Sequence, residues 1–179
     1  MRSSLYLVPD QAGVDPGVAN RRTGLWVFMG VVAMLFFLFS CAYVMRMGLP
    51  DWRPLPRAPW QLWLSTALLA AAGVAWRRAV VGWGCVLSLA FLASQLWAWR
   101  AADFALDANP ANSFFYLITG LHALHVAGGL MVAVGARRSQ AGIQLCARYW
   151  HFMLALWLAM FGLLFWVTPR FVQIVCDAF

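Results

Sequence analysis

The sequence predicts an all-α, polytopic membrane protein with five transmembrane helices, its amino terminus inside the cell and its carboxyl terminus outside. Composition is the first reason: 64% of the 179 residues are hydrophobic and 11% are charged, against about 25% charge in ordinary soluble domains. The second reason is that five apolar runs carry no Asp, Glu, Lys or Arg. A helix of about 20 such residues crosses the hydrocarbon core of a bilayer. The predicted helices lie at about 24–45, 60–76, 79–99, 114–136 and 149–168.

The segments before and after the first run are predicted to lie outside the membrane. Residues 1–20 are expected to form a loose cytoplasmic tail, because proline and glycine there break any helical pattern. Residues 21–179 then form the membrane domain. Residues 48–59 hold four prolines, so this outer connection cannot be helical throughout and is predicted to run extended.

The remaining connections are short. Arg77 and Arg78 predict a tight turn, so the second and third helices should be antiparallel neighbours. Ser113 is the predicted amino-terminal cap of the fourth helix, and residues 137–148 are predicted to form the last cytoplasmic loop. Eight tryptophans lie near predicted helix ends, as in the aromatic belts of membrane proteins: Trp26, Trp60, Trp63, Trp76, Trp97, Trp99, Trp150 and Trp166.

The arginines favour one orientation in the membrane. Eight of the 13 fall on the side of the amino terminus, and the other five share their side with four of the six aspartates. Because cytoplasmic loops carry an excess of positive charge, the amino terminus is predicted inside. The net charge of +7 could suggest nucleic acid, but arginines in short loops beside helix ends indicate membrane topology and no nucleic-acid partner. Lipid phosphates are expected instead to contact Arg21, Arg22 and Arg148.

Two histidines, His122 and His125, lie one helical turn apart inside the fourth run. Polar side chains at that depth are costly, so they indicate a functional or architectural role. Small residues around them let helices approach closely: Gly120, Ala123, Ala127 and Gly128. We therefore expect both imidazoles to hydrogen-bond across a helix interface, each bond contributing about 0.6–2 kcal/mol. His151, beside Trp150, is expected near the membrane surface as a further architectural residue.

A metal or haem site built from these histidines is disfavoured by their predicted depths. His125 lies about 15 Å from the cytoplasmic end of its predicted helix, and His151 lies about 3 Å into the next helix. The nitrogens of a zinc site each lie about 2 Å from the ion. We therefore predict no metal-ligating or cofactor-binding residue in this chain.

Catalysis and transport are the alternative functions for a chain of this kind. An intramembrane serine protease needs a serine facing a histidine, and the conceivable pair is Ser94 or Ser113 with His122. A small transporter is typically marked by repeats, broken helices or intramembrane charge, and the sequence has none of these marks. We predict no catalytic residue.

Several segments resemble subunit III of the haem-copper cytochrome oxidases. The signature helix of that family is similar to the run from Phe114 to Gly129, Phe-Phe-Tyr-Leu-Ile-Thr-Gly-Leu-His-Ala-Leu-His-Val-Ala-Gly-Gly. Its last helix is similar to Tyr149-Trp-His-Phe152 followed by Trp157. Weaker likenesses cover Gly24-Leu-Trp-Val-Phe28 with Phe36, Phe37 and Tyr43, then Trp63–Leu69 and Phe91–Gln95. The resemblance is collinear from about Arg21 to Pro169.

The resemblance implies a five-helix form of that fold, without the family's first two helices. It implies a non-catalytic subunit of a bacterial terminal oxidase of the cytochrome c oxidase type, multi-pass in the inner membrane and serving aerobic electron transport. Haem and copper would belong to partner subunits, while this chain would bind phospholipid. Subunit I would be the main contact, with subunit II and small subunits as further partners. The expected roles are packing on subunit I, lipid binding and stability during turnover.

Two departures from the family pattern remove carboxylates. The family often has Glu where Val32 stands, and an Asp where Met153 and Leu154 follow the Trp-His-Phe motif. No role in proton handling or internal bracing is therefore expected from those carboxylates here. Two other hypotheses stay open: an accessory protein of a nitric oxide reductase system in the same family, and a small membrane transporter or intramembrane enzyme.

Overall fold

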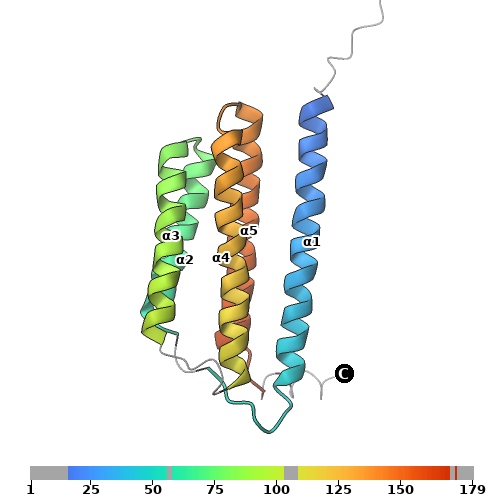
Figure 1. The fold of residues 1–179 in the computed structure, drawn as a ribbon, viewed down its shortest axis with the longest axis vertical. Coiled ribbons are helices and arrows are strands. Elements are labelled where there is room, and N and C mark those ends of the chain that lie inside the picture. The colour runs from blue at the N-terminus through green and yellow to red at the C-terminus, as the bar shows by residue number, and fades with distance from the viewer. Residues whose placement is uncertain (1–15, 56–57, 103–108, 170–171, 173–179) are drawn as a thin grey trace, which may run out of the picture.

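The computed structural model describes residues 16–55, 58–102, 109–169 and 172, and in these residues it has five α-helices and no strands. They are α1 (Pro16–Arg46), α2 (Trp60–Arg77), α3 (Val81–Ala102), α4 (Pro110–Ala136) and α5 (Gln140–Trp166). The all-α prediction is confirmed. All except α2 are long and apolar enough to cross a membrane, and the chain is a multi-pass membrane protein. The 18-residue α2 lies alongside α3, against which it packs most extensively (Figure 1).

The helices run side by side, and chain neighbours point in opposite directions (Figure 1). We call end A the end that holds the start of α1 and the α2–α3 and α4–α5 turns, and end B the opposite end. The α2–α3 pair forms one flank, α4 and α5 form the middle, and α1 forms the other flank. Within the bundle α5 packs against α1, α2 and α4, whereas α1 packs against α4 and α5.

Three helices begin earlier than the apolar runs indicate, and α1 and α5 do so by two turns or more. The first starts at Pro16, so the expectation of a non-helical chain up to Asn20 is wrong for residues 16–20, because proline is tolerated in the first turn of a helix. Residues 1–15 of the predicted tail lie outside the described residues. The fifth starts at Gln140, where the Ser139 side chain accepts a hydrogen bond from the Gly142 backbone N–H at 3.1 Å. Most of the loop predicted at 137–148 is therefore helix.

The start of α4 corrects the cap predicted at Ser113. Asn109 is the capping residue, and its Oδ1 accepts a hydrogen bond from the Ala111 backbone N–H at 3.2 Å. Pro110 occupies the first helical position, where its missing N–H costs nothing. Ser113 lies one turn inside the helix, because α4 starts before the uncharged apolar run at 114–136.

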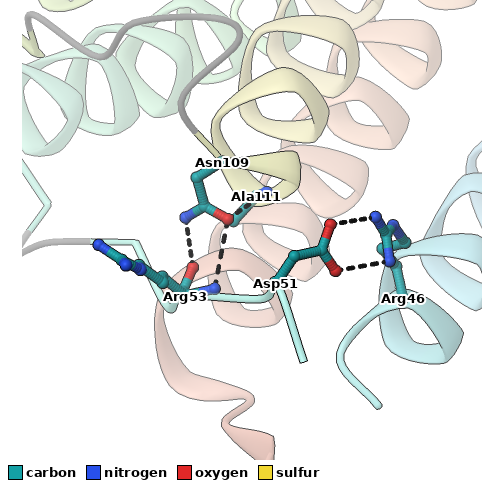
Figure 2. A network of polar contacts seen from close by, with 5 residues as sticks. All are labelled: Arg46, Asp51, Arg53, Asn109 and Ala111. Carbon is teal, nitrogen blue, oxygen red and sulfur yellow. Dashed lines mark hydrogen bonds and ion pairs between the residues drawn. The ribbon is translucent and has the colours of Figure 1, made fainter. Parts of the chain in front are cut away.

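Figure 2 shows that Asn109 also fixes the connection between α1 and α2. Its Nδ2 donates to the Arg53 carbonyl oxygen at 2.5 Å, and its Oδ1 accepts from the Arg53 backbone N–H at 3.3 Å. Nearby, both guanidinium amines of Arg46 donate to the Asp51 carboxylate, at 2.9 and 2.5 Å. That ion pair is partly exposed, so it contributes little free energy. The buried Asn109 is the stronger link between this connection and the start of α4.

Replacing Asn109 tests this double role. Asn109→Ala removes the cap and both bonds to Arg53, and we expect it to lower the free energy of unfolding by about 1–2 kcal/mol. Asn109→Ser keeps a side-chain oxygen that can cap α4 and loses the bonds to Arg53, so its loss of stability should be smaller. Thermal denaturation of the detergent-solubilised protein measures both. Equal losses for the two variants would contradict the capping role.

Candidate functional site

His122 joins α4 to α5 in the middle of the bundle. Its side chain is fully buried, and its Nε2 lies 3.0 Å from the Met153 carbonyl oxygen on α5. Because a carbonyl oxygen only accepts, Nε2 is the donor. Aromatic rings from three other helices surround the imidazole, with centroids 6.5 Å away for Phe36, 5.7 Å for Phe91 and 5.2 Å for Trp157.

The other two histidines bind within their own helices. His125 Nδ1 donates to the Leu121 carbonyl oxygen at 2.7 Å, and His151 Nδ1 donates to the Ala147 carbonyl oxygen at 2.6 Å. The side chain of His125 contacts α1 instead through the rings of Phe28 and Phe36, at 6.1 and 5.7 Å. A cross-helix hydrogen bond is thus present for His122, whereas the bond of His125 stays within α4.

The depth predicted for His151 is wrong. Since α5 begins at Gln140, His151 lies eleven residues, or about 16 Å, into the helix rather than near its start. It is two residues from Met153, so it lies close to the height of His122. The two rings nevertheless face different helices. His151 lies over Gly73 of α2, whereas His122 lies among aromatic rings of α1, α3 and α5. Among the described residues, no three His, Cys, Asp or Glu side chains come together as metal ligands would.

Two tryptophans of α5 donate hydrogen bonds across the bundle. Trp150 Nε1 donates to Ser88 Oγ of α3 at 2.7 Å, and Trp157 Nε1 donates to Thr66 Oγ1 of α2 at 2.8 Å. The Trp150 ring also lies 4.7 Å from that of Trp76, and both are 1% exposed. These two rings are core residues and not members of an aromatic belt, because the longer α5 places Trp150 well inside the bundle. Nothing in the sequence pattern marks Ser88 and Thr66 as the acceptors of these bonds.

The serines proposed for a protease pair lie elsewhere. Ser94 shares a 2.7 Å hydrogen bond with Ser65 of α2 and donates to the Phe91 carbonyl oxygen of its own helix. Ser113 lies exposed near the start of α4, more than two turns from His122. Neither serine is hydrogen-bonded to His122.

The glycines of α4 divide into two kinds. A Cβ on Gly129 would meet the Tyr149 ring, whose hydroxyl donates to the His125 carbonyl oxygen at 2.8 Å. A Cβ on Gly120 would touch the Trp99 ring at 3.5 Å. A Cβ on Gly128 would meet nothing within 4 Å. The close approach expected at Gly128 is therefore found one residue later, at Gly129.

An apolar groove of about 510 Å³ lies between α1 and the α4–α5 pair toward end A. Gly24 and Gly128 both line it, and a Cβ added to either glycine would have no atom within 4 Å. Arg21 is the charged residue in its lining, and His125 also lines it. Arg22 and Arg148 are exposed but are not in the lining. The other lining residues are largely apolar: Leu25, Phe28, Leu124, Gly129, Val132, Ala136, Gly142, Leu145, Cys146, Tyr149 and Trp150.

Comparison with known families identifies this bundle. The family model described as cytochrome c oxidase subunit III matches residues 62–168, more than half of the chain. The chain belongs to the cytochrome c oxidase subunit III family. The matched segment begins in α2 and includes α3, α4 and α5 with all three histidines.

Individual members of the cytochrome c oxidase subunit III family align over most of the chain. A protein named cytochrome c oxidase subunit 3 from Synechocystis sp. is 25% identical, over 81% of this chain and 75% of its own length. The protein of the same name from Pylaiella littoralis is 28% identical, over 93% and 72%. That from Thermostichus vulcanus is 26% identical, over 83% and 88%.

The two positions where this subunit III chain lacks expected carboxylates lie in the bundle. Val32 of α1 is 2% exposed and Met153 of α5 is 1% exposed, so both apolar side chains fill core space. Met153 also supplies the carbonyl oxygen that binds His122. An ionised carboxylate buried at either position would need a partner, whereas the apolar side chains of Val32 and Met153 need none and fill the space by packing.

Alanine at the two adjacent glycines should have opposite effects. Gly129→Ala forces the Tyr149 ring to move and weakens its bond to the His125 carbonyl, so we expect a loss of about 1–3 kcal/mol. Gly128→Ala adds a methyl group in open space and improves helix propensity, so stability should stay the same or rise by up to about 1 kcal/mol. Thermal denaturation in detergent compares them, and a similar loss in both would contradict the assigned packing.

Proposed function

We propose that this chain is a non-catalytic subunit III of a bacterial haem-copper terminal oxidase of the cytochrome c oxidase type. The observation that carries the proposal is how the three histidines are used: each commits a ring nitrogen to a backbone carbonyl oxygen, which suits a scaffold. Haem and copper would be held by partner subunits, where oxygen is reduced. The names of the relatives compared above favour an oxidase over a nitric oxide reductase accessory protein or a transporter.

The charge distribution supports an orientation with end A in the cytoplasm of a bacterial inner membrane. Paired arginines lie at the start of α1 and at both turns of end A: Arg21, Arg22, Arg77, Arg78, Arg137 and Arg138. The described residues at end B carry fewer arginines, and one of them, Arg46, is neutralised by Asp51. An excess of positive charge on short cytoplasmic loops sets this orientation.

We assign subunit I as the main partner, with subunit II and small subunits as further contacts. Support comes from family membership, since a protein named as a subunit assembles with others, and from the exposed side chains of α1. These include large apolar groups that need either lipid or another protein around them: Trp26, Val27, Val31, Met34, Phe37 and Leu38.

The groove suits one acyl chain of an anionic phospholipid. Its α4 wall runs from Leu124 to Ala136, about 18 Å of helix, and the lining is largely apolar. Arg21, exposed at end A, would meet the phosphate where the headgroups lie. Of the three arginines expected at lipid phosphates, Arg21 is therefore the one we assign to this groove.

Deletion of the subunit from the assembled oxidase tests the proposed function. A scaffold contributes nothing to the redox centres, so haem content and the initial rate of oxygen consumption should be retained. The activity should then decay in fewer turnovers than in the complete complex. The measurement is oxygen consumption followed over many turnovers. Loss of haem on deletion, or haem bound by the isolated chain, would contradict the assignment.

Filling the groove tests lipid binding separately. Gly128→Leu places a side chain in the open space beside Gly128, and we expect fewer phospholipids to copurify with the oxidase and its activity to decay sooner. Gly82→Leu is the matched control, because Gly82 of α3 is equally open but lies away from the groove. Mass spectrometry of extracted lipid gives the count. Unchanged lipid in Gly128→Leu would remove this groove as the site while leaving the subunit assignment intact.

A further inference from the structure

Gln95 on α3 is a polar side chain sealed inside the bundle. It is 1% exposed, and neither its Nε2 nor its Oε1 has a hydrogen-bond partner in the part of the chain that the structure describes. An amide offers two donors and two acceptor lone pairs. Leaving such groups unpaired is costly in any core and more so within a membrane, where no bulk solvent can reach them.

The contacts on either side of Gln95 place it in the seam between α3 and α4. One turn before it on the same helix face, the Phe91 ring meets the His122 ring at 5.7 Å. One turn after it, Trp99 Nε1 donates to Thr119 Oγ1 of α4 at 3.1 Å. Positions 91, 95 and 99 follow one face of a helix. Gln95 therefore lies between two contacts with α4, at the height of His122 and Thr119.

His122 carries the matching unpaired atom. Its Nε2 hydrogen is used by the Met153 carbonyl oxygen, which leaves Nδ1 as a lone-pair acceptor on the neutral ring. Nδ1 is buried and has no partner among the described residues. Trp157 closes this region from α5, with its ring 5.7 Å from Phe91 and 5.2 Å from His122.

We propose that an internal water molecule binds between α3 and α4, bridging the Gln95 amide and His122 Nδ1. Buried waters typically make about three hydrogen bonds to otherwise unpaired groups. The site offers three: Nδ1 and Oε1 accept the two water hydrogens, and Nε2 donates to the water oxygen. The surroundings favour a neutral ligand over an ion, because the flanking side chains are aromatic rings and the Thr119 hydroxyl, without a charged group among them. The water would connect Gln95 of α3 to His122 of α4, and the His122 hydrogen bond to the Met153 carbonyl oxygen extends the connection to α5. Three helices are then linked.

A map of the assembled oxidase that resolves ordered water elsewhere tests the site directly. We expect separate density about 2.7–3.2 Å from both the Gln95 amide and His122 Nδ1. Empty space at that position, or a Gln95 amide hydrogen-bonded directly to protein groups, would overturn the proposal.

A matched pair of variants gives an independent measurement. Gln95→Met keeps the length of the side chain and removes the amide, whereas Leu96→Met alters the next residue, which faces outward. Infrared spectra of the oxidase in H₂¹⁶O and H₂¹⁸O identify bound water by its isotope-shifted O–H band. We expect Gln95→Met to lose a band that both the unaltered oxidase and Leu96→Met retain. Identical water bands in all three would overturn the bridge.

Discussion

The structure depends on pairing polar groups across helices, because no bulk solvent inside a membrane bundle can satisfy them. This pairing converges on α5, which is hydrogen-bonded to each of the other helices. Tyr43 Oη of α1 donates to the Leu164 carbonyl oxygen of α5 at 3.4 Å, and His122 of α4 donates to the Met153 carbonyl oxygen of α5. In the other direction, Trp157 of α5 donates to Thr66 of α2, and Trp150 of α5 donates to Ser88 of α3. Their donors lie at different heights, so they fix both the rotation and the height of α5.

The same arrangement explains why the groove lies where it does. The hydrogen bond from α1 to α5 is made by Tyr43, near end B, while α1 stands apart from α4 and α5 toward end A (Figure 1). There the contact relies on rings such as Phe28 against Tyr149, and Gly24 and Gly128 leave space unfilled. The acyl chain that we propose would occupy this space beside α1, so its binding would leave the hydrogen bonds of α5 undisturbed.

Hydropathy predicts how many helices the chain forms, because an uncharged run long enough to cross a bilayer is stable in lipid as an α-helix. It does not predict their ends: Gln140 to Arg148 is polar enough to resemble a loop, and the Asn109 cap precedes the apolar run. Buried pairing of His122 follows from its depth, but its partner is a backbone carbonyl that carries no sequence signal. Whether Gly128 or Gly129 touches Tyr149 depends on a 100° rotation about the helix axis, which small-residue spacing leaves undetermined.

The most direct test of the account is the coupling between Trp150 and Ser88, the hydrogen bond that ties α5 to α3. A double-mutant cycle combines Trp150→Phe and Ser88→Ala, with unfolding free energies measured in detergent. If cross-helix pairing holds α5, the two changes should be non-additive by about 0.6–2 kcal/mol. Additive losses would contradict it, and would mean that apolar packing alone fixes the bundle.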